Sequence, residues 1–141
     1  MQTRNTTSES TQTDDQAVKQ TILDYVEGVY EADPSRIERS VHPALAKRGF
    51  FVNEAGATES LMSFAEFIDH TKTYNQDGQF PPDAPKDIII YEILDHTASA
   101  KLIAAWGIDY MHLAKYEDRW MIVHVLWQTH PQNKAEDGRL L

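Results

Sequence analysis

The 141-residue sequence predicts a single α+β domain in which a curved antiparallel sheet is wrapped around three N-terminal helices. In the first half of the chain, apolar residues recur at helical spacing. From Lys86 onward, four runs rich in β-branched and aromatic residues follow one another with gaps of about two residues. Gaps this short allow only antiparallel hairpins, because a parallel pair needs a crossover of about a dozen residues.

The two ends of the chain are polar. Residues 1–13 are almost wholly Thr, Ser, Gln, Asn and charged residues, so we expect a disordered tail that cannot bury enough apolar surface to fold. Residues 14–130 then form the single domain, and residues 131–141 form a second polar tail.

The first helix is expected over Asp15–Glu31, with Asp14 or Asp15 as its N-cap. Its apolar residues recur at spacings of 3 and 4, which is typical of an amphipathic helix. These residues are Val18, Ile22, Tyr25, Val26 and Val29.

Two shorter helices and one short strand complete the first half. Pro34–Ser40 begins at a proline that suits a first helical turn, and Phe64–Thr73 is capped by Ser63. Between them, Gly49–Asn53 is expected to be a short strand that ends in a turn. The third helix has one apolar face, formed by Phe64, Phe67 and Ile68.

The second half is predicted to be a four-stranded meander. An irregular loop from Thr73 to Pro85 precedes it, because this stretch contains Gly78 and three prolines. The expected strands are Lys86–Asp95, Thr97–Trp106, Ile108–Tyr116 and Arg119–Gln128.

The composition argues against several classes of protein. The net charge of −9 disfavours nucleic acid as a partner, and no apolar stretch approaches the roughly 18 residues that cross a membrane. The lack of cysteine excludes disulfides and thiolate chemistry, and the isolated glycines form no phosphate-binding loop. Residues 1–15 have no apolar segment like that of a signal peptide, so we expect a cytoplasmic protein. We also expect that the protein uses no cofactor.

Four stretches distributed along the chain resemble the family known as putative lumazine-binding, within the nuclear transport factor 2-like superfamily. They are Tyr25–Asp33, His42-Pro43, Asp109–Lys115 and Arg119–Trp127, and the resemblance extends from about Gln16 to Gln128. It implies a cone, with a strongly curved sheet packed against three helices, a cavity at the open end and dimerisation through the sheet. The superfamily includes ketosteroid isomerase, scytalone dehydratase, polyketide cyclases and non-catalytic modules, so the resemblance implies a fold and not an activity.

The alternation of side chains in the last strands predicts the two faces of the sheet. If Glu117-Asp118 is a two-residue turn, Met111 lies opposite His124 and Asp109 lies opposite Leu126. The expected concave face consists of Ala100, Leu102, Ala104, Asp109, Met111, Leu113, Trp120, Ile122, His124 and Leu126. The convex face should be an apolar association surface, and we expect a homodimer through Tyr110, His112, Val123, Val125 and Trp127.

Asp109 and His124 are the candidate catalytic pair, because a carboxylate and an imidazole enclosed together shift each other's pKa and can perform acid–base chemistry. A structural role for both residues stays open and is the commoner one for buried polar groups, with Asp109 bonded to the backbone or to Tyr25 and His124 a core histidine. The similarity to ketosteroid isomerase implies that Tyr25 directs its hydroxyl into the cavity and stabilises an oxyanion, although a structural role is also open.

The expected ligand-contacting residues are mostly aromatic, and each is also compatible with an ordinary core position. They are Tyr25, His42, Phe51, Phe64, Phe67, Trp106, Met111 and Trp120. The six histidines include no pair at i, i+4 spacing, so no metal site is expected.

Three functions follow from these observations and the resemblance. The first is binding of a small, mainly apolar or aromatic ligand in the cavity by a homodimer. The second is a cofactor-independent isomerase or dehydratase, in which Asp109 is the general base, His124 relays a proton and Tyr25 stabilises the oxyanion. The third is a non-catalytic dimerisation or partner-binding module that uses the convex face.

Overall fold

The computed structural model describes residues 13–131, and the predicted tails at 1–12 and 132–141 lie outside the described residues. The described part confirms the α+β class, with two helices, two strands, a third helix and then four strands. The helices are α2 (Asp14–Tyr30), α3 (Pro34–Ser40) and α4 (Phe64–Thr71). The strands are β1 (Val41–Asn53), β2 (Gly56–Met62), β3 (Lys86–Ile93), β4 (Thr97–Ala104), β5 (Gly107–Tyr116) and β6 (Arg119–Thr129).

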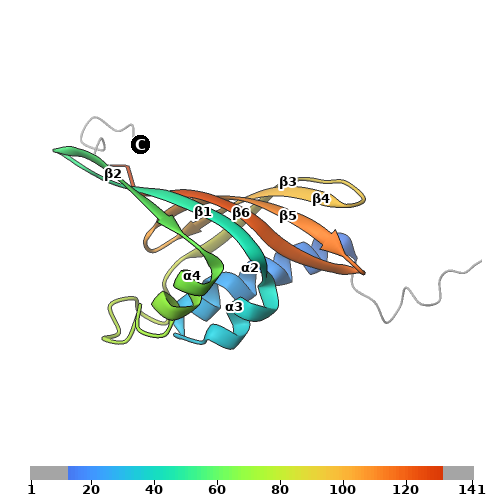
Figure 1. Cartoon of the computed structure of the whole chain (residues 1–141), viewed down its shortest axis with the longest axis horizontal. Coiled ribbons are helices and arrows are strands. Elements are labelled where there is room, and N and C mark those ends of the chain that lie inside the picture. The colour runs from blue at the N-terminus through green and yellow to red at the C-terminus, as the bar shows by residue number, and fades with distance from the viewer. Residues whose placement is uncertain (1–12, 132–141) are drawn as a thin grey trace, which may run out of the picture.

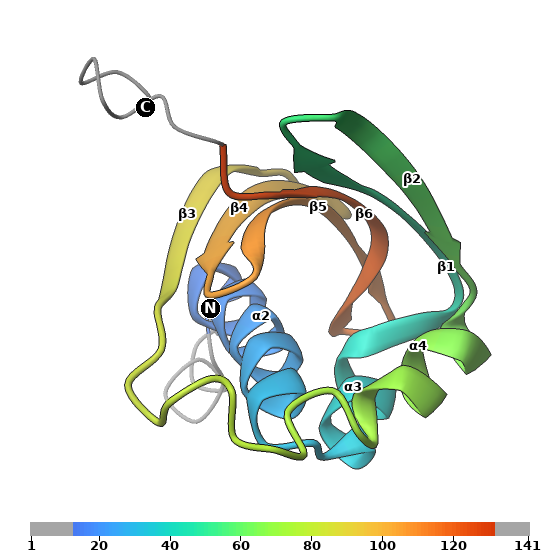
Figure 2. The same ribbon diagram turned by 90° about the vertical axis from the view of Figure 1, so that its left-hand side faces the viewer.

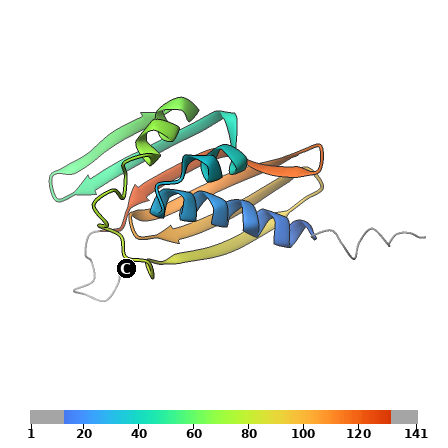
Figure 3. The same cartoon turned by 90° about the horizontal axis from the view of Figure 1, so that it is seen from below.

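The strands form one curved sheet, in the order β2-β1-β6-β5-β4-β3, and the helices lie on its concave side (Figures 1 and 2). Helix α2 packs against β3, β4 and β6, whereas the shorter α4 packs against β1 and β2 (Figure 3). The core lies between α2 and the middle of the sheet. Its fully buried residues include Val18, Ile22, Val26, Leu102, Met111, Leu113 and Ile122.

Helix α2 begins one residue earlier than the sequence predicts. Its N-cap is Thr13, whose hydroxyl accepts from the backbone N–H of Gln16 at 3.1 Å, while the Gln16 side chain accepts from the Thr13 N–H at 3.2 Å. The prediction that Asp14 or Asp15 is the cap is therefore wrong. Both carboxylates lie in the first turn, where they interact favourably with the helix dipole. The predicted Ser63 cap of α4 is confirmed.

The sheet has one strand more than expected, and it is mixed. The predicted strand Gly49–Asn53 is the end of the 13-residue β1, which pairs with β2. Strand β2 is mostly exposed, contains Gly56 and Ala57 and shows no apolar alternation, which is why the sequence did not predict it. Strand β1 runs parallel to β6, and the long segment between them supplies the crossover that a parallel pair requires.

A bulge in β6 changes which residues face the helices. Near the turn the register is as predicted, with Leu113 opposite Ile122, but His112 lies opposite His124, which leaves Val123 as an extra residue. Beyond Val123 every side chain is therefore on the other face from the one expected.

The bulge corrects the predicted faces at four positions. Val125 is buried opposite Met111, and Trp127 also faces inward. His124 and Leu126 are exposed on the convex face. The predicted positions of His124 and Leu126 on the concave face, and of Val125 and Trp127 on the convex face, are therefore wrong.

The preceding hairpin also turns earlier than expected, at Ala105-Trp106 rather than Trp106-Gly107, because Ala104 pairs with Gly107. The pairing of β4 with β5 is therefore shifted by two residues, and an even shift leaves every side chain of β4 on the face that was predicted. Ala100, Leu102 and Ala104 are buried as predicted.

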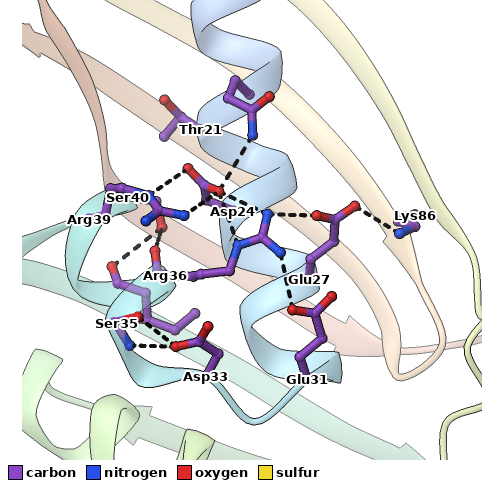
Figure 4. A network of polar contacts seen from close by, with 12 residues as sticks. Thr21, Asp24, Glu27, Glu31, Asp33, Ser35, Arg36, Arg39, Ser40 and Lys86 are labelled. Atoms are coloured by element: carbon purple, nitrogen blue, oxygen red, sulfur yellow. Dashed lines mark hydrogen bonds and ion pairs between the residues drawn. The ribbon is translucent and has the colours of Figure 1, made fainter.

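A network of charged side chains fixes α3 against α2 and β3 (Figure 4). Arg36 of α3 forms ion pairs with Asp24 at 2.9 Å and Glu27 at 2.6 Å on α2, and Arg39 also contacts Asp24, at 3.0 Å. Lys86 of β3 contacts Glu27 at 2.8 Å. Burial opposes ionisation of Asp24, but its hydrogen bonds to Arg39 and Arg36 outweigh burial and lower its pKa. The network fixes the path of the chain from α2 into β1.

Candidate functional site

A cavity of about 630 Å³ lies between the curved sheet, α2, α4 and the loop that follows α4. Aromatic side chains make up much of its wall, together with a few polar groups. The lining residues are Tyr25, Val29, Lys47, Phe51, Ser60, Met62, Phe67, His70, Tyr74, Gln79, Phe80, Trp106, Trp127 and Thr129. A cavity of this size and composition is suited to a small organic molecule.

The loop between α4 and β3 forms one wall of the cavity. Asn75 holds it in place, because its side-chain amide donates to the Tyr30 carbonyl at 2.8 Å and its carbonyl accepts from the Phe80 N–H at 2.8 Å. Phe80 thereby lies 6.2 Å from Trp106 and 5.3 Å from Tyr74 between ring centres. The sequence predicts the irregular conformation of this loop but gives no sign of its place beside the cavity.

Asp109 is fully buried on β5 beneath the cavity wall. Its Oδ1 accepts from the indole N–H of Trp106 at 2.8 Å, and its Oδ2 accepts from the hydroxyl of Tyr25 at 3.1 Å. Burial raises the pKa of Asp109, whereas the charge of Lys47 and these two hydrogen bonds lower it, and burial prevails. The structure thus brings together Tyr25 and Asp109, as the structural alternative in the sequence analysis expected.

Lys47 of β1 is a functional candidate that the sequence analysis missed. Its ammonium donates a hydrogen bond to the Tyr25 hydroxyl and lies 4.6 Å from the ring centre of Phe67 and 5.7 Å from that of Trp127. Burial lowers the pKa of Lys47 to about 8, although the negative charge of Asp109 acts in the opposite direction. A longer predicted strand would have revealed Lys47, because it shares a face with Gly49 and Phe51.

The other titratable groups of the wall favour their neutral forms near pH 7. Burial, and then the charge of Lys47, lower the pKa of His70. Burial and the charge of Asp109 raise the pKa of Tyr74 to about 12, and the same two causes raise that of Tyr25. Lys47 is therefore the principal source of charge on the wall.

Four of the predicted ligand-contacting residues line the cavity, namely Tyr25, Phe51, Phe67 and Trp106. The other four do not. Phe64 packs against the core, and Met111 is buried within it. The indole of Trp120 donates to Asp14 at the start of α2, at 3.0 Å, and the ring of His42 stacks on Tyr116 with 4.8 Å between ring centres.

The predicted catalytic pair is not assembled. His124 lies on the convex face, where its Nδ1 is 3.2 Å from Nδ1 of His112, so it cannot reach Asp109 on the opposite side of the sheet. Of the predicted dimer residues, Tyr110 and His112 are exposed and Val123 is partly buried at the bulge. Val125 and Trp127 face inward, which removes them from that surface.

Two further properties concern the part of the chain that the structure describes. Within residues 13–131, no three His, Cys, Asp or Glu side chains are grouped as metal ligands would be. No helix in the same range is long and apolar enough to cross a membrane.

A curved sheet over three helices, with a cavity at one end, defines a nuclear transport factor 2-like α+β protein, and solved structures support this class. An NTF2-like protein of unknown function from Shewanella baltica OS155 superposes with a TM-score of 0.65 at 20% identity, covering 92% of this chain and 100% of the other. A domain of unknown function with a cystatin-like fold from Nostoc punctiforme PCC 73102 gives a TM-score of 0.67 at 8% identity, covering 91% and 84%. These likenesses show the fold.

Residues 13–128 match the family described as "Putative lumazine-binding", and the chain belongs to that family, as its sequence motifs suggested. A further similar structure is described as a "Putative Scytalone Dehydratase" from Novosphingobium aromaticivorans DSM 12444, with a TM-score of 0.60 at 10% identity, covering 84% of this chain and 85% of the other. None of the curated proteins has a sequence that matches this chain.

Proposed function

We propose that this protein binds a small, mainly aromatic molecule in the cavity between the sheet and α4. The observation that carries the proposal is the combination of an aromatic wall with hydrogen-bond donors at one place. Phe67, Trp106 and Trp127 offer flat apolar surfaces, and the ammonium of Lys47 offers N–H donors that can orient a ligand oxygen. The family description also suggests a bicyclic aromatic ligand of the lumazine type.

Calorimetric titration with lumazine, with 2-naphthoate and with the neutral aromatic 2-naphthamide tests this proposal. We expect at least one of these probes to bind the wild-type protein. Ser60→Trp places a large side chain on the cavity wall and should abolish this binding, whereas Leu61→Trp changes the neighbouring, largely exposed residue of β2 and should not. Failure of all three probes to bind, or equal binding by the two variants, would overturn the proposal.

The geometry favours binding over general-base catalysis by Asp109. Both oxygens of this carboxylate already accept hydrogen bonds, and Tyr25 stands between the carboxylate and Lys47. Tyr25 uses its one donor on Asp109, so the free donors here are those of the Lys47 ammonium, which suit a carbonyl or anionic oxygen of a ligand. The isomerase or dehydratase function therefore stays a prediction, for which loss of turnover in Asp109→Asn would be required.

We also propose that a second copy of the chain covers the convex face, through a corrected set of residues. Tyr110 and Leu126 pair at the middle of the sheet and are each 50% exposed. Arg48 and Lys101 flank them on the neighbouring strands, followed by the exposed Ile89 beside Lys101. Exposed apolar residues grouped in this way are typical of an association surface.

Sedimentation velocity tests this association. The wild-type chain should sediment as a dimer, and Tyr110→Asp combined with Leu126→Asp should convert it to a folded monomer. Ala65→Asp combined with Thr73→Asp adds the same two charges at exposed positions in and after α4, and this control should leave the dimer intact. A wild-type monomer would overturn this part of the proposal.

A further inference from the structure

The cavity holds one ammonium group whose surroundings are unusual for a lysine. The Nζ atom of Lys47 lies among the rings of Phe67, Tyr25 and Trp127, at 4.6, 5.2 and 5.7 Å from their centres. Its hydrogen-bond partner within residues 13–131 is the hydroxyl of Tyr25. An ammonium has three N–H donors, so two donors are available to a ligand.

No carboxylate of the described residues forms an ion pair with Lys47. The nearby Asp109 is separated from it by the Tyr25 hydroxyl, and the lining residues of the cavity include no Asp or Glu. A partly buried cation without a directly bound anion is costly, and contacts with aromatic rings compensate for only part of that cost. A bound ligand can therefore supply the negative charge that the cavity wall does not provide for Lys47.

We propose that the ligand of this cavity is an aromatic acid whose anionic oxygen pairs with Lys47 while its ring packs against Trp127 and Phe67. This inference rests on the proposed function and adds the charge of the ligand to it. A carboxylate, an acidic enol or a deprotonated imide all meet the requirement, because each combines a planar ring system with a negatively charged oxygen. A cationic ligand is disfavoured, because it would place two positive charges together.

A matched pair of probes separates charge from shape. The ionised 2-naphthoate and the neutral 2-naphthamide share the same ring system and nearly the same size. Calorimetric titration at pH 7 should show that 2-naphthoate binds the wild-type protein at least about 10-fold more tightly, the effect of one charge-assisted hydrogen bond.

Variants assign this preference to one side chain. Lys47→Met should reduce the affinity for 2-naphthoate about 10- to 100-fold and leave that for 2-naphthamide within about threefold. Lys47→Arg keeps the positive charge and should retain part of the preference. Lys19→Met removes an exposed charge from α2, away from the cavity and the convex face, and should leave both affinities unchanged.

The pH dependence gives an independent measurement on the unmodified protein. The affinity for 2-naphthoate should fall as the pH rises above about 8, where Lys47 loses its proton, while that for 2-naphthamide stays constant. The titratable groups around Lys47 are Tyr25 of α2, His70 of α4 and Asp109 of β5, and Tyr74 of the loop after α4 lines the same cavity. None of the three aromatic groups gains charge between pH 7 and about 9, because burial favours their neutral forms.

The outcomes distinguish this inference from the proposed function. Equal binding of the two probes by the wild type, or a preference that survives in Lys47→Met, would overturn the anionic ligand while leaving the aromatic binding site. Failure of both probes to bind would overturn the anionic ligand, and failure of lumazine as well would overturn the proposed function too. If Lys47→Met lacks native near-ultraviolet circular dichroism, the wild-type pH profiles decide, since two parallel profiles would overturn the inference.

Discussion

The hydroxyl of Tyr25 donates a 3.1 Å hydrogen bond to Oδ2 of Asp109, which joins helix α2 to strand β5 through the core. Both side chains are fully buried, so water cannot replace either partner if the other is removed. The Tyr25 oxygen also accepts a hydrogen bond from Lys47. This tyrosine therefore connects the stability of the fold to the polar groups of the cavity.

Replacement of Tyr25 by phenylalanine should lower the free energy of unfolding by about 1–3 kcal/mol, the usual cost of leaving a buried acceptor without its donor. Urea denaturation monitored by circular dichroism measures the change. Tyr91→Phe removes an exposed hydroxyl of β3 and should change stability by less than about 0.5 kcal/mol. If both substitutions had equally small effects, the buried hydrogen bond would contribute nothing measurable.

The depressed pKa of Lys47 predicts how stability depends on pH. Its pKa is about 8 in the folded protein, below the ordinary value of 10.5, so the unfolded chain binds this proton more strongly. The resulting destabilisation is fully present below pH 8 and is lost as the pH rises toward 10.5. Tyrosines could lower stability at high pH, because the unfolded chain would lose their protons more easily than the folded one. Below a pH of about 9.5 the tyrosines of the unfolded chain are still mostly neutral, so they do not reverse the rise in stability caused by Lys47.

Stability should therefore rise between pH 8 and about 9.5 in the wild type relative to Lys47→Met. The gain should be at most about 2 kcal/mol, because one pKa unit corresponds to about 1.4 kcal/mol and partial exposure of Lys47 reduces the effect. Urea midpoints of the two proteins across this range provide the test. Parallel curves would show that the amine titrates as in the unfolded chain.

Because of the bulge at Val123, we expect substitutions at the adjacent residues His124 and Val125 to have very different effects on stability. Val125→Asp should lower the free energy of unfolding by about 3 kcal/mol or more, because it places a charge in the core opposite Met111. His124→Asp should cost less than about 1 kcal/mol, because its side chain is exposed. Thermal and urea denaturation of both variants measure the difference. The reverse order of stabilities would mean that β5 and β6 pair without the bulge.

Much of the fold could be predicted because its signals are local. The spacing of apolar residues identifies α2, and the two-residue gaps identify the last four strands as hairpins. The extra residue at Val123 leaves no such signal. Both faces of β6 carry apolar residues, so its sequence fits a regular strand as well as a bulged one. That single residue explains why His124, Val125 and Trp127 were assigned to the wrong faces.

The candidate site was harder to predict because its parts are distant in sequence. Tyr25 and Asp109 could be proposed from their chemistry, and the structure shows the hydrogen bond between them. Lys47 was missed because β1 contains a proline and begins without apolar alternation, so only its last residues were recognised as a strand. Tyr74 and Phe80 were missed because the position of an irregular loop depends on tertiary contacts such as those of Asn75.

Gly49 of β1 lies directly against the indole of Trp127, and this contact leads to the last prediction. A Cβ atom added at Gly49 would lie 1.8 Å from Cε2 of Trp127, so Gly49→Ala must displace the ring. We expect a loss of about 1–3 kcal/mol of stability from this overpacking. Weaker binding of 2-naphthamide should accompany it, because Trp127 forms part of the cavity wall.

A double-mutant cycle attributes this effect to the contact itself. In a Trp127→Leu background the smaller side chain leaves room for the added methyl group, so Gly49→Ala should cost less than about 0.5 kcal/mol there. Urea denaturation of the four proteins yields the coupling energy. An equal cost in both backgrounds would place the strain in the backbone of β1 instead, and the glycine would then have no role in shaping the cavity.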